Sequence, residues 1–343
     1  MNNTNRFPSL DYLRLLAASA VMYSHSYVLA GAAEQEPYIQ IISKIDAASL
    51  AVNFFFFLSG YLMFGALPRS ETRIKFLTNR FARIVPGLAV CVGLTIVIGF
   101  FLTTRSKLDY LTSLQTFSYL KNIAFLFTHS IPGVFESQPY PSVINGSLWT
   151  LFYEVACYCL LSLIQYLNQR TRIMILCTAA GLCLIYLGLV EYMGPTFLGN
   201  IARLTLFFCA GYIFCKAIKA KIFFYGTFLA LLCSCYTLDQ LIQPVAGSLI
   251  ASVLICAALL DIAFRTDCYF KHLPFDCSFG AYIYAFPIQQ WLISLNLQIG
   301  PLQLLICSLC IVLPIAIMSW IFVEKPAMAR IRNFSKTDLL RSI

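Results

Sequence analysis

The chain alternates between long apolar runs and short polar breaks. Ten runs have about the 20 residues that a helix needs to cross a hydrocarbon core of roughly 30 Å. They cover residues 9–30, 47–67, 84–103, 148–168, 173–192, 199–217, 221–237, 243–264, 278–297 and 302–323. The pattern predicts an all-α, polytopic membrane protein with about ten transmembrane helices. No long linker interrupts the runs, so residues 1–343 are expected to form one transmembrane domain without a separate soluble domain.

Composition supports a membrane protein. Hydrophobic residues make up 59% of the chain and charged residues 11%, and the mean hydropathy is +0.77, which lies far from the usage of soluble proteins. The first apolar run contains Arg14 and lacks a small-residue cleavage pattern, so it is expected to stay in the mature protein as a helix rather than act as a cleaved signal peptide.

The charged residues between the runs predict the orientation. The break after the second run carries a marked excess of basic residues: Arg69, Arg73, Lys75, Arg80 and Arg83 against Glu71. Basic loops stay in the cytoplasm, and further Lys and Arg fall at 170–172, 216–221 and 325–341, on the same predicted side. We therefore expect both termini to be cytoplasmic. Because topology accounts for the net charge of +9, no nucleic-acid partner is expected.

The fourteen cysteines do not predict disulfides. Nearly all fall within apolar runs and are expected to be small buried hydrophobic residues, such as Cys91, Cys157, Cys177, Cys209, Cys256 and Cys307. The pairs Cys157/Cys159 and Cys233/Cys235 have CxC spacing, but no second Cys/His pair accompanies either. No metal site is therefore expected.

Two ionisable residues interrupt the first apolar run. Arg14 and His25 are eleven residues apart, which is close to three helical turns and a rise of roughly 16 Å, so they share one face. A charged group at membrane depth is costly, and this face should point to a bundle interior or an aqueous cavity. Arg14 snorkelling to the interface and His25 acting only as an interhelical hydrogen-bond partner are the alternatives.

Glu154 is the carboxylate expected at the depth of His25. In NGSLWTLFYEVACY, Asn145 or Ser147 can cap a helix that begins outside, which places Glu154 about two turns in. A carboxylate beside an imidazole raises its basicity, as a general base requires, although a structural buried pair is the alternative. Arg203 lies a turn into its run from the same side, and it either orients an acceptor or balances Glu154.

Arg80 and Arg83 lie three apart in NRFARIVP, just before the run at 84–103. Guanidinium groups on one helical face suit a phosphate-bearing ligand, but the positive-inside bias alone would also place them there. Both are expected to be interfacial, so that their loss strands no buried charge. In FFFFLSGYLMF, Ser59 and Gly60 are expected to permit close backbone approach rather than chemistry.

Six stretches of the chain together resemble the acyltransferase 3 family of membrane O-acyltransferases. They are FPSLDYLRLLAASAVMYSH, FFFLSGYL, RFARIVP, GSLWTLFYE, SFGAYIYAFP and FVEKP. The combination of Arg14 and His25 with FLSGY and the RxxR segment is specific, and the resemblance runs along nearly the whole chain. The chain departs from the family pattern at Ala285, because family members often carry a histidine at this place, two residues before the proline of the SFGAYIYAFP stretch.

The resemblance implies transfer of an acetyl group from acetyl-CoA to a hydroxyl of an extracytoplasmic lipid-linked or surface polysaccharide, such as O-antigen. It implies a multi-pass protein of the bacterial inner membrane, with acetyl-CoA as a substrate and no tightly bound cofactor. The residues expected to act are His25 and Glu154 in catalysis, Arg14, Arg80 and Arg83 in CoA binding, and Arg203, Trp149 and Tyr282 in acceptor binding.

Two questions stay open at this point. Direct transfer and an acetylated His25 intermediate are both compatible with these residues. The alternative function is a secondary transporter or flippase, because buried Arg, His and Glu also mark substrate pathways, although no repeat halves support it. His129 in an external loop and His272 in an internal one lie outside the predicted spans and are expected to tolerate alanine.

Overall fold

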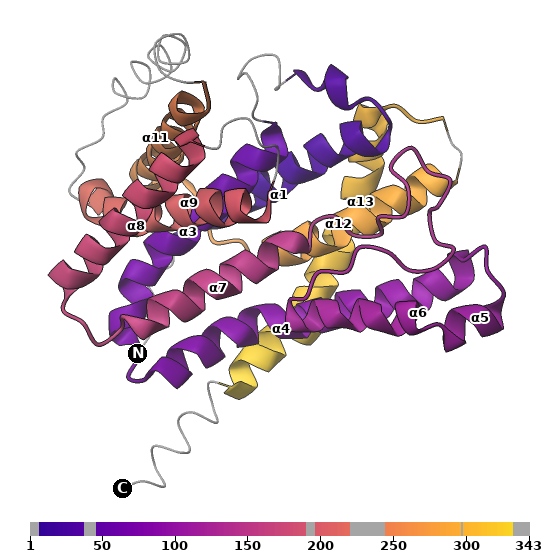
Figure 1. The fold of residues 1–343 in the computed structure, drawn as a ribbon, viewed down its shortest axis with the longest axis horizontal. Coiled ribbons are helices and arrows are strands. Elements are labelled where there is room, and N and C mark those ends of the chain that lie inside the picture. The colour runs from indigo at the N-terminus through magenta and orange to yellow at the C-terminus, as the bar shows by residue number, and fades with distance from the viewer. Residues whose placement is uncertain (1–6, 38–45, 190–195, 220–243, 296–297, 332–343) are drawn as a thin grey trace, which may run out of the picture. The chain divides into compact units, whose positions relative to one another are not determined.

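The computed structural model describes residues 7–37, 46–189, 196–219, 244–295 and 298–331, and these residues form helices and loops without a strand (Figure 1). Each predicted run except 221–237, which lies outside the described residues, coincides with a helix. These helices are α1 (Pro8–Leu29), α3 (Ala47–Arg69), α4 (Arg73–Leu102), α7 (Trp149–Leu163), α8 (Gln169–Leu189), α9 (Phe197–Lys219), α11 (Pro244–Thr266), α12 (Ser278–Ser294) and α13 (Pro301–Ser319).

The described residues include six helices that are long and apolar enough to cross a membrane. They span Ala47–Arg69, Arg73–Leu102, Gln169–Leu189, Phe197–Cys215, Ser248–Tyr269 and Pro301–Ile331. The described part of the chain is thus all-helical and has the character of a multi-pass membrane protein. The total of about ten spans and the cytoplasmic position of both termini stay predictions.

Two helix boundaries differ from the expected ones. Helix α4 begins at Arg73, so Arg80 and Arg83 lie within the helix instead of before it. Helix α7 ends at Leu163, and residues 164–168 form a turn. The side chain of Asn168 accepts a hydrogen bond from the backbone N–H of Thr171 at 2.9 Å, which starts α8.

The helices fall into two compact units, each described by itself. The first unit comprises the chain up to Ala17, Tyr38–Phe76 and Tyr153–Leu273, and it contains α3, α8, α9, α11 and most of α7. The second unit comprises Ala18–Pro37, Leu77–Phe152 and the chain from Pro274, and it contains most of α4, α12 and α13. The second unit also holds the short helices η1 (Ala33–Gln35), α5 (Lys107–Thr112), α6 (Leu114–Ser118) and η2 (Tyr119–Ala124), together with the π-turn η4 (Trp320–Glu324).

A close crossing of α3 and α9 organises the first unit. A Cβ atom on Gly60 would lie 1.9 Å from the backbone oxygen of Phe208, and one on Gly211 would lie 1.8 Å from the backbone oxygen of Phe57. Only glycine fits at either position, because the two backbones meet there. The expectation that Gly60 of the FLSGY stretch serves close packing is confirmed.

In the second unit, α12 packs on α13, and side chains link α12 to other segments. A Cβ on Gly280 would lie 2.9 Å from the Cα of Ala316. The side-chain amide of Gln289 donates to the backbone oxygen of Met22 at 2.9 Å. These links tie α12 both to its neighbour α13 and to the second half of α1.

A buried tyrosine holds α5 on α4. The Tyr110 hydroxyl donates to the backbone oxygen of Ile96 at 2.7 Å, and a Cβ on Gly99 would come within 2.5 Å of that hydroxyl. Burial raises the pKa of Tyr110 to about 12, so the hydroxyl stays protonated and keeps donating at neutral pH.

The described cysteines are all free thiols. Four of the six expected to be buried are so: Cys91, Cys157, Cys209 and Cys256. Cys177 on α8 and Cys307 on α13 are exposed, so the expectation of burial was wrong for these two. A residue within an apolar run need not be buried by the protein, because the outer face of a spanning helix contacts lipid. Cys233 and Cys235 lie outside the described residues.

Candidate active site

His25 is half-buried near the end of α1 and packs against an aromatic ring of α12. Its imidazole lies edge-on to Phe286, with 5.0 Å between ring centroids and an interplanar angle of 77°. Phe286 is itself buried, and a Cβ on Gly146 would lie 2.6 Å from its ring. Phe286 of the SFGAYIYAFP stretch is thus an aromatic neighbour of the candidate base.

Glu36, which no sequence motif singled out, is a buried carboxylate in the segment after α1. The Ser24 hydroxyl donates to Glu36 at 2.8 Å, and Glu36 also interacts with Tyr23. Its carboxylate therefore lies against the residue that precedes His25. The sequence signal for this arrangement is Gly31, whose φ of 73° lets the chain reverse after α1.

Glu154 lies in α7 and is hydrogen-bonded within the first unit. The hydroxyl of Tyr158 donates to Glu154 at 2.5 Å and lies 3.4 Å from the hydroxyl of Ser59 in the FLSGY stretch. Tyr158 was not expected in the site, although its spacing of four residues from Glu154 places both on one helical face. His25 belongs to the second unit and Glu154 to the first, so their pairing stays a prediction.

Arg203, expected to contact the acceptor, lies in α9 and has two polar neighbours in the first unit. It interacts with Asp46 and with Tyr153. Asp46 is the N-cap of α3, where its side chain accepts a hydrogen bond from the backbone N–H of Ser49. Arg203 therefore has an acidic neighbour, Asp46, that the sequence did not indicate.

Arg83 lies among acidic and aromatic side chains of the second unit. Its guanidinium is 2.7 Å from Asp276, 3.9 Å from Glu324 and 5.1 Å from the ring centre of Trp320. Glu324 is fully buried, and the hydroxyl of Ser319 donates to it at 3.1 Å. The expectation that removing Arg83 strands no buried charge was therefore wrong, because the neighbouring carboxylates come from segments far along the chain.

Arg80 differs from Arg83 although both face the same side of α4. It is half-buried, and its Nε has no hydrogen-bond partner among the described residues. Arg14, the third predicted contact for CoA, is half-buried in α1 and belongs to the first unit.

Tyr282 joins α12 to the start of α7. Its hydroxyl donates to the backbone oxygen of Ser147 at 3.0 Å and lies 2.7 Å from the hydroxyl of Thr150. The side chain of Asn145 bonds the backbone N–H of Ser147, in a turn before the helix, and the backbone oxygen of Ile283. The start of α7 is therefore fixed by α12.

The last predicted acceptor residue, Trp149, and the two loop histidines lie in different parts of the chain. Trp149 is the first residue of α7 and is half-buried. Acceptor binding by Trp149 and Tyr282 stays a prediction. His129 and His272 are exposed and lie outside the helices, as expected.

Comparison with known proteins gives two matches. The family described as "Acyltransferase domain", which is the acyltransferase 3 family, matches residues 7–321. A protein named O-acetyl transferase from Shigella phage Sf6 is 29% identical over 353 aligned positions, which cover 96% of this chain and 98% of that protein. No solved structure matches the chain.

Proposed function

Because the chain belongs to the acyltransferase 3 family and is therefore an acyltransferase, we propose that it moves an acetyl group from cytoplasmic acetyl-CoA to a hydroxyl of an extracytoplasmic polysaccharide. The acceptor is a lipid-linked or surface glycan such as O-antigen, and the protein resides in the bacterial inner membrane. The family match favours this enzyme over the transporter considered from the sequence alone.

The observation that carries the proposal is the continuity of α1. The helix runs unbroken from Pro8 to Leu29, so Arg14 and His25 share one face and lie roughly 16 Å apart along it. That face offers a cation toward the predicted cytoplasmic end and a candidate base toward the opposite end. This order suits a donor that enters from inside and an acceptor that enters from outside.

The phosphates of CoA are assigned to the arginines of the predicted cytoplasmic side. Arg80 is the principal contact, since its Nε has no partner among the described residues and a guanidinium binds phosphate well. Arg83, held by Asp276, and Arg14 at the start of the His25 face complete the predicted donor site.

The chemistry is assigned to His25. Its imidazole takes the proton of the acceptor hydroxyl while the hydroxyl oxygen attacks the thioester carbonyl, the C–S bond breaks, and CoA leaves as the thiolate that then takes up the proton. Glu154 stabilises the imidazolium that forms. Transfer through an acetylated His25 gives the same products, and Arg203, Trp149 and Tyr282 are the predicted acceptor contacts in either route.

The test is His25→Ala, with His129→Ala and His272→Ala as exposed histidine controls. We expect transfer to fall by about 10²- to 10⁴-fold, the contribution of a positioned base, while acetyl-CoA still binds because its phosphates lie at the other end of the helix. Transfer is measured as O-acetyl signals in NMR spectra of surface polysaccharide from a deletion strain that carries each variant. Acetyl-CoA binding is measured on the purified proteins. Near-normal O-acetylation by a folded His25→Ala protein would overturn the assignment.

A further inference from the structure

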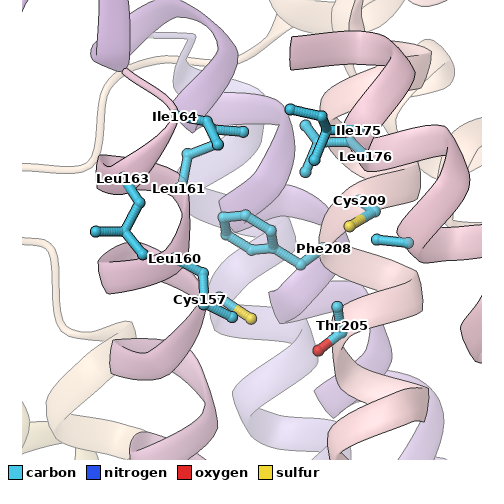
Figure 2. Close-up of a pocket in the computed structure, with 11 residues that line it drawn as sticks. Cys157, Leu160, Leu161, Leu163, Ile164, Ile175, Leu176, Thr205, Phe208 and Cys209 are labelled. Atoms are coloured by element: carbon cyan, nitrogen blue, oxygen red, sulfur yellow. The ribbon is translucent and has the colours of Figure 1, made fainter. Parts of the chain in front are cut away.

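An apolar cavity of about 280 Å³ lies in the first unit, between α7, α8 and α9. Figure 2 shows Leu161 of α7 and Ile164 of the following turn on one side and Ile175 and Leu176 of α8 on the other, with Phe208 of α9 between them. Carbon and sulfur atoms form almost the whole lining, so the cavity suits a hydrocarbon ligand.

The rim of this cavity is exposed. Leu160 and Leu163 of α7 are 58% and 60% exposed, and Ile175 of α8 is 40% exposed. In a membrane protein, large apolar side chains on the outer face of such helices contact lipid chains. The cavity therefore opens toward the bilayer hydrocarbon.

Three polar residues are neighbours, in sequence or by helical spacing, of residues that line the cavity. Gln165 follows Ile164, Arg172 precedes Ile175 and Leu176 by three and four residues, and Tyr212 follows Cys209 and Phe208 by three and four. Residues at these helical spacings share a face, and Arg172 interacts electrostatically with Tyr212, so the two lie at the same end. The distribution of basic residues predicts that this end is cytoplasmic.

These three side chains are buried and incompletely bonded. Gln165, Arg172 and Tyr212 are each at least nine-tenths buried. Within the part of the chain that the structure describes, Oε1 of Gln165, Nε of Arg172 and the hydroxyl of Tyr212 have no hydrogen-bond partner. Buried polar atoms without partners are unfavourable, so a ligand that supplies oxygen acceptors and a hydroxyl donor would be stabilised there.

We propose that the cavity and these three side chains form a binding site for an anionic glycerophospholipid of the cytoplasmic leaflet. Part of one acyl chain fills the cavity, the phosphate accepts hydrogen bonds from Arg172 and Tyr212, and a headgroup hydroxyl donates to Gln165. Arg73 adds positive charge at this turn, because it donates to the backbone oxygen of Leu163 at 3.2 Å and lies over the ring of Tyr166. The apolar cavity selects a lipid over a free phosphate.

The experiment compares lipid binding by the full chain in detergent, measured by native mass spectrometry. The probes are phosphatidylglycerol and phosphatidylcholine with identical chains, and inorganic phosphate. We expect phosphatidylglycerol to be retained in preference to phosphatidylcholine by about tenfold, which is the effect of one hydrogen bond to a charged group. Millimolar phosphate is not expected to displace it.

Paired substitutions on α8 separate the polar end from the cavity. Arg172→Gln removes the buried cation and Arg170→Gln removes an exposed one, whereas Ala179→Phe fills the cavity and Ala180→Phe adds the same ring outside its lining. We expect Arg172→Gln and Ala179→Phe to lose the preference and the other two variants to keep it.

Three outcomes would overturn the proposal. These are equal retention of the two lipids by the unsubstituted chain, displacement of phosphatidylglycerol by phosphate, and equal effects within either pair of variants. If Arg172→Gln fails to fold, the alanine pair and the lipid comparison decide.

Discussion

The helices within each of the two units are held together by different kinds of contact. In the first unit, α3 and α9 cross so closely that Gly60 and Gly211 each face a backbone carbonyl of the other helix. In the second unit, α12 packs closely on α13 at Gly280, but polar side chains also tie it to α7 and α1, through Tyr282 and Gln289. The closest backbone contacts therefore lie in the first unit, and hydrogen bonds and ion pairs join segments far apart along the chain in the second.

This difference bears on where each kind of ligand binds. Apolar contact alone gives helices little reason to associate in a bilayer, so close packing or polar bonding must hold each unit. A unit closed by apolar packing leaves grooves that suit lipid chains, such as the cavity between α7, α8 and α9. A unit cross-linked by polar bonds fixes its polar side chains, as acyl transfer at His25 would require.

The largest expected effect comes from a substitution at the crossing of α3 and α9, where Gly60 and Gly211 lie; we call this contact the glycine crossing. Gly60→Ala or Gly211→Ala puts a methyl group within 2 Å of a carbonyl oxygen, so α3 and α9 must separate. We expect loss of the folded protein or destabilisation above the roughly 1–3 kcal/mol typical of overpacking. Yield and thermal unfolding in detergent provide the measurement.

Gly181→Ala is the matched control, because a Cβ at that position of α8 meets nothing within 4 Å. Its expected effect is neutral to stabilising, by up to about 1 kcal/mol from helix propensity. Similar stability of the Gly60→Ala and Gly181→Ala proteins would show that the crossing tolerates separation.

The glycine crossing also shows how far the sequence predicts the fold. Apolar runs of span length predicted the helices because burial in lipid depends on composition and length. The FLSGY stretch predicted close packing at Gly60 because small residues have that role in membrane helices. Its partner, Gly211, carries no local signal that joins it to Gly60, since the two are 151 residues apart and only the tertiary fold brings them together.

The site was predictable to a smaller extent for the same reason. His25 and Glu154 could be chosen because ionisable residues in apolar runs are costly. The side chains around them were missed, because Glu36 resembles an ordinary loop charge and Tyr158 an ordinary aromatic residue of an apolar helix. Likewise, no spacing in the sequence indicates that Asp276 and Glu324 meet Arg83.

A smaller effect than helix separation is expected from Arg83→Gln, which tests whether ion pairs hold the second unit. The change leaves Glu324 buried without its guanidinium partner, and we expect a loss of about 3 kcal/mol, as for other broken buried pairs. Arg83→Gln/Glu324→Gln should recover part of that stability because the stranded charge is removed.

Arg80→Gln is the control for the ion-pair test. It changes the same charge on the same helix and should leave stability within about 0.5 kcal/mol, while weakening acetyl-CoA binding if the proposed donor site is right. Thermal unfolding of these three variants and of the unsubstituted protein provides the measurement. Equal stability of the Arg80→Gln and Arg83→Gln proteins would show that the ion pairs do not hold the second unit.

The smallest expected effect is on acetyl transfer, and it tests which carboxylate stabilises the protonated form of His25. Each unit contains one candidate. Glu154 is the carboxylate that the sequence predicts at the depth of His25, and Glu36 accepts a hydrogen bond from Ser24 in the unit of His25. We expect Glu154→Gln to lower transfer by about 10- to 100-fold, within the contribution of a positioned base, with acetyl-CoA binding unchanged. Glu36→Gln should lower it less than about threefold, because an amide oxygen can still accept the Ser24 hydrogen bond. O-acetyl content and acetyl-CoA binding are measured for both variants, and the reverse ranking would assign the supporting carboxylate to Glu36.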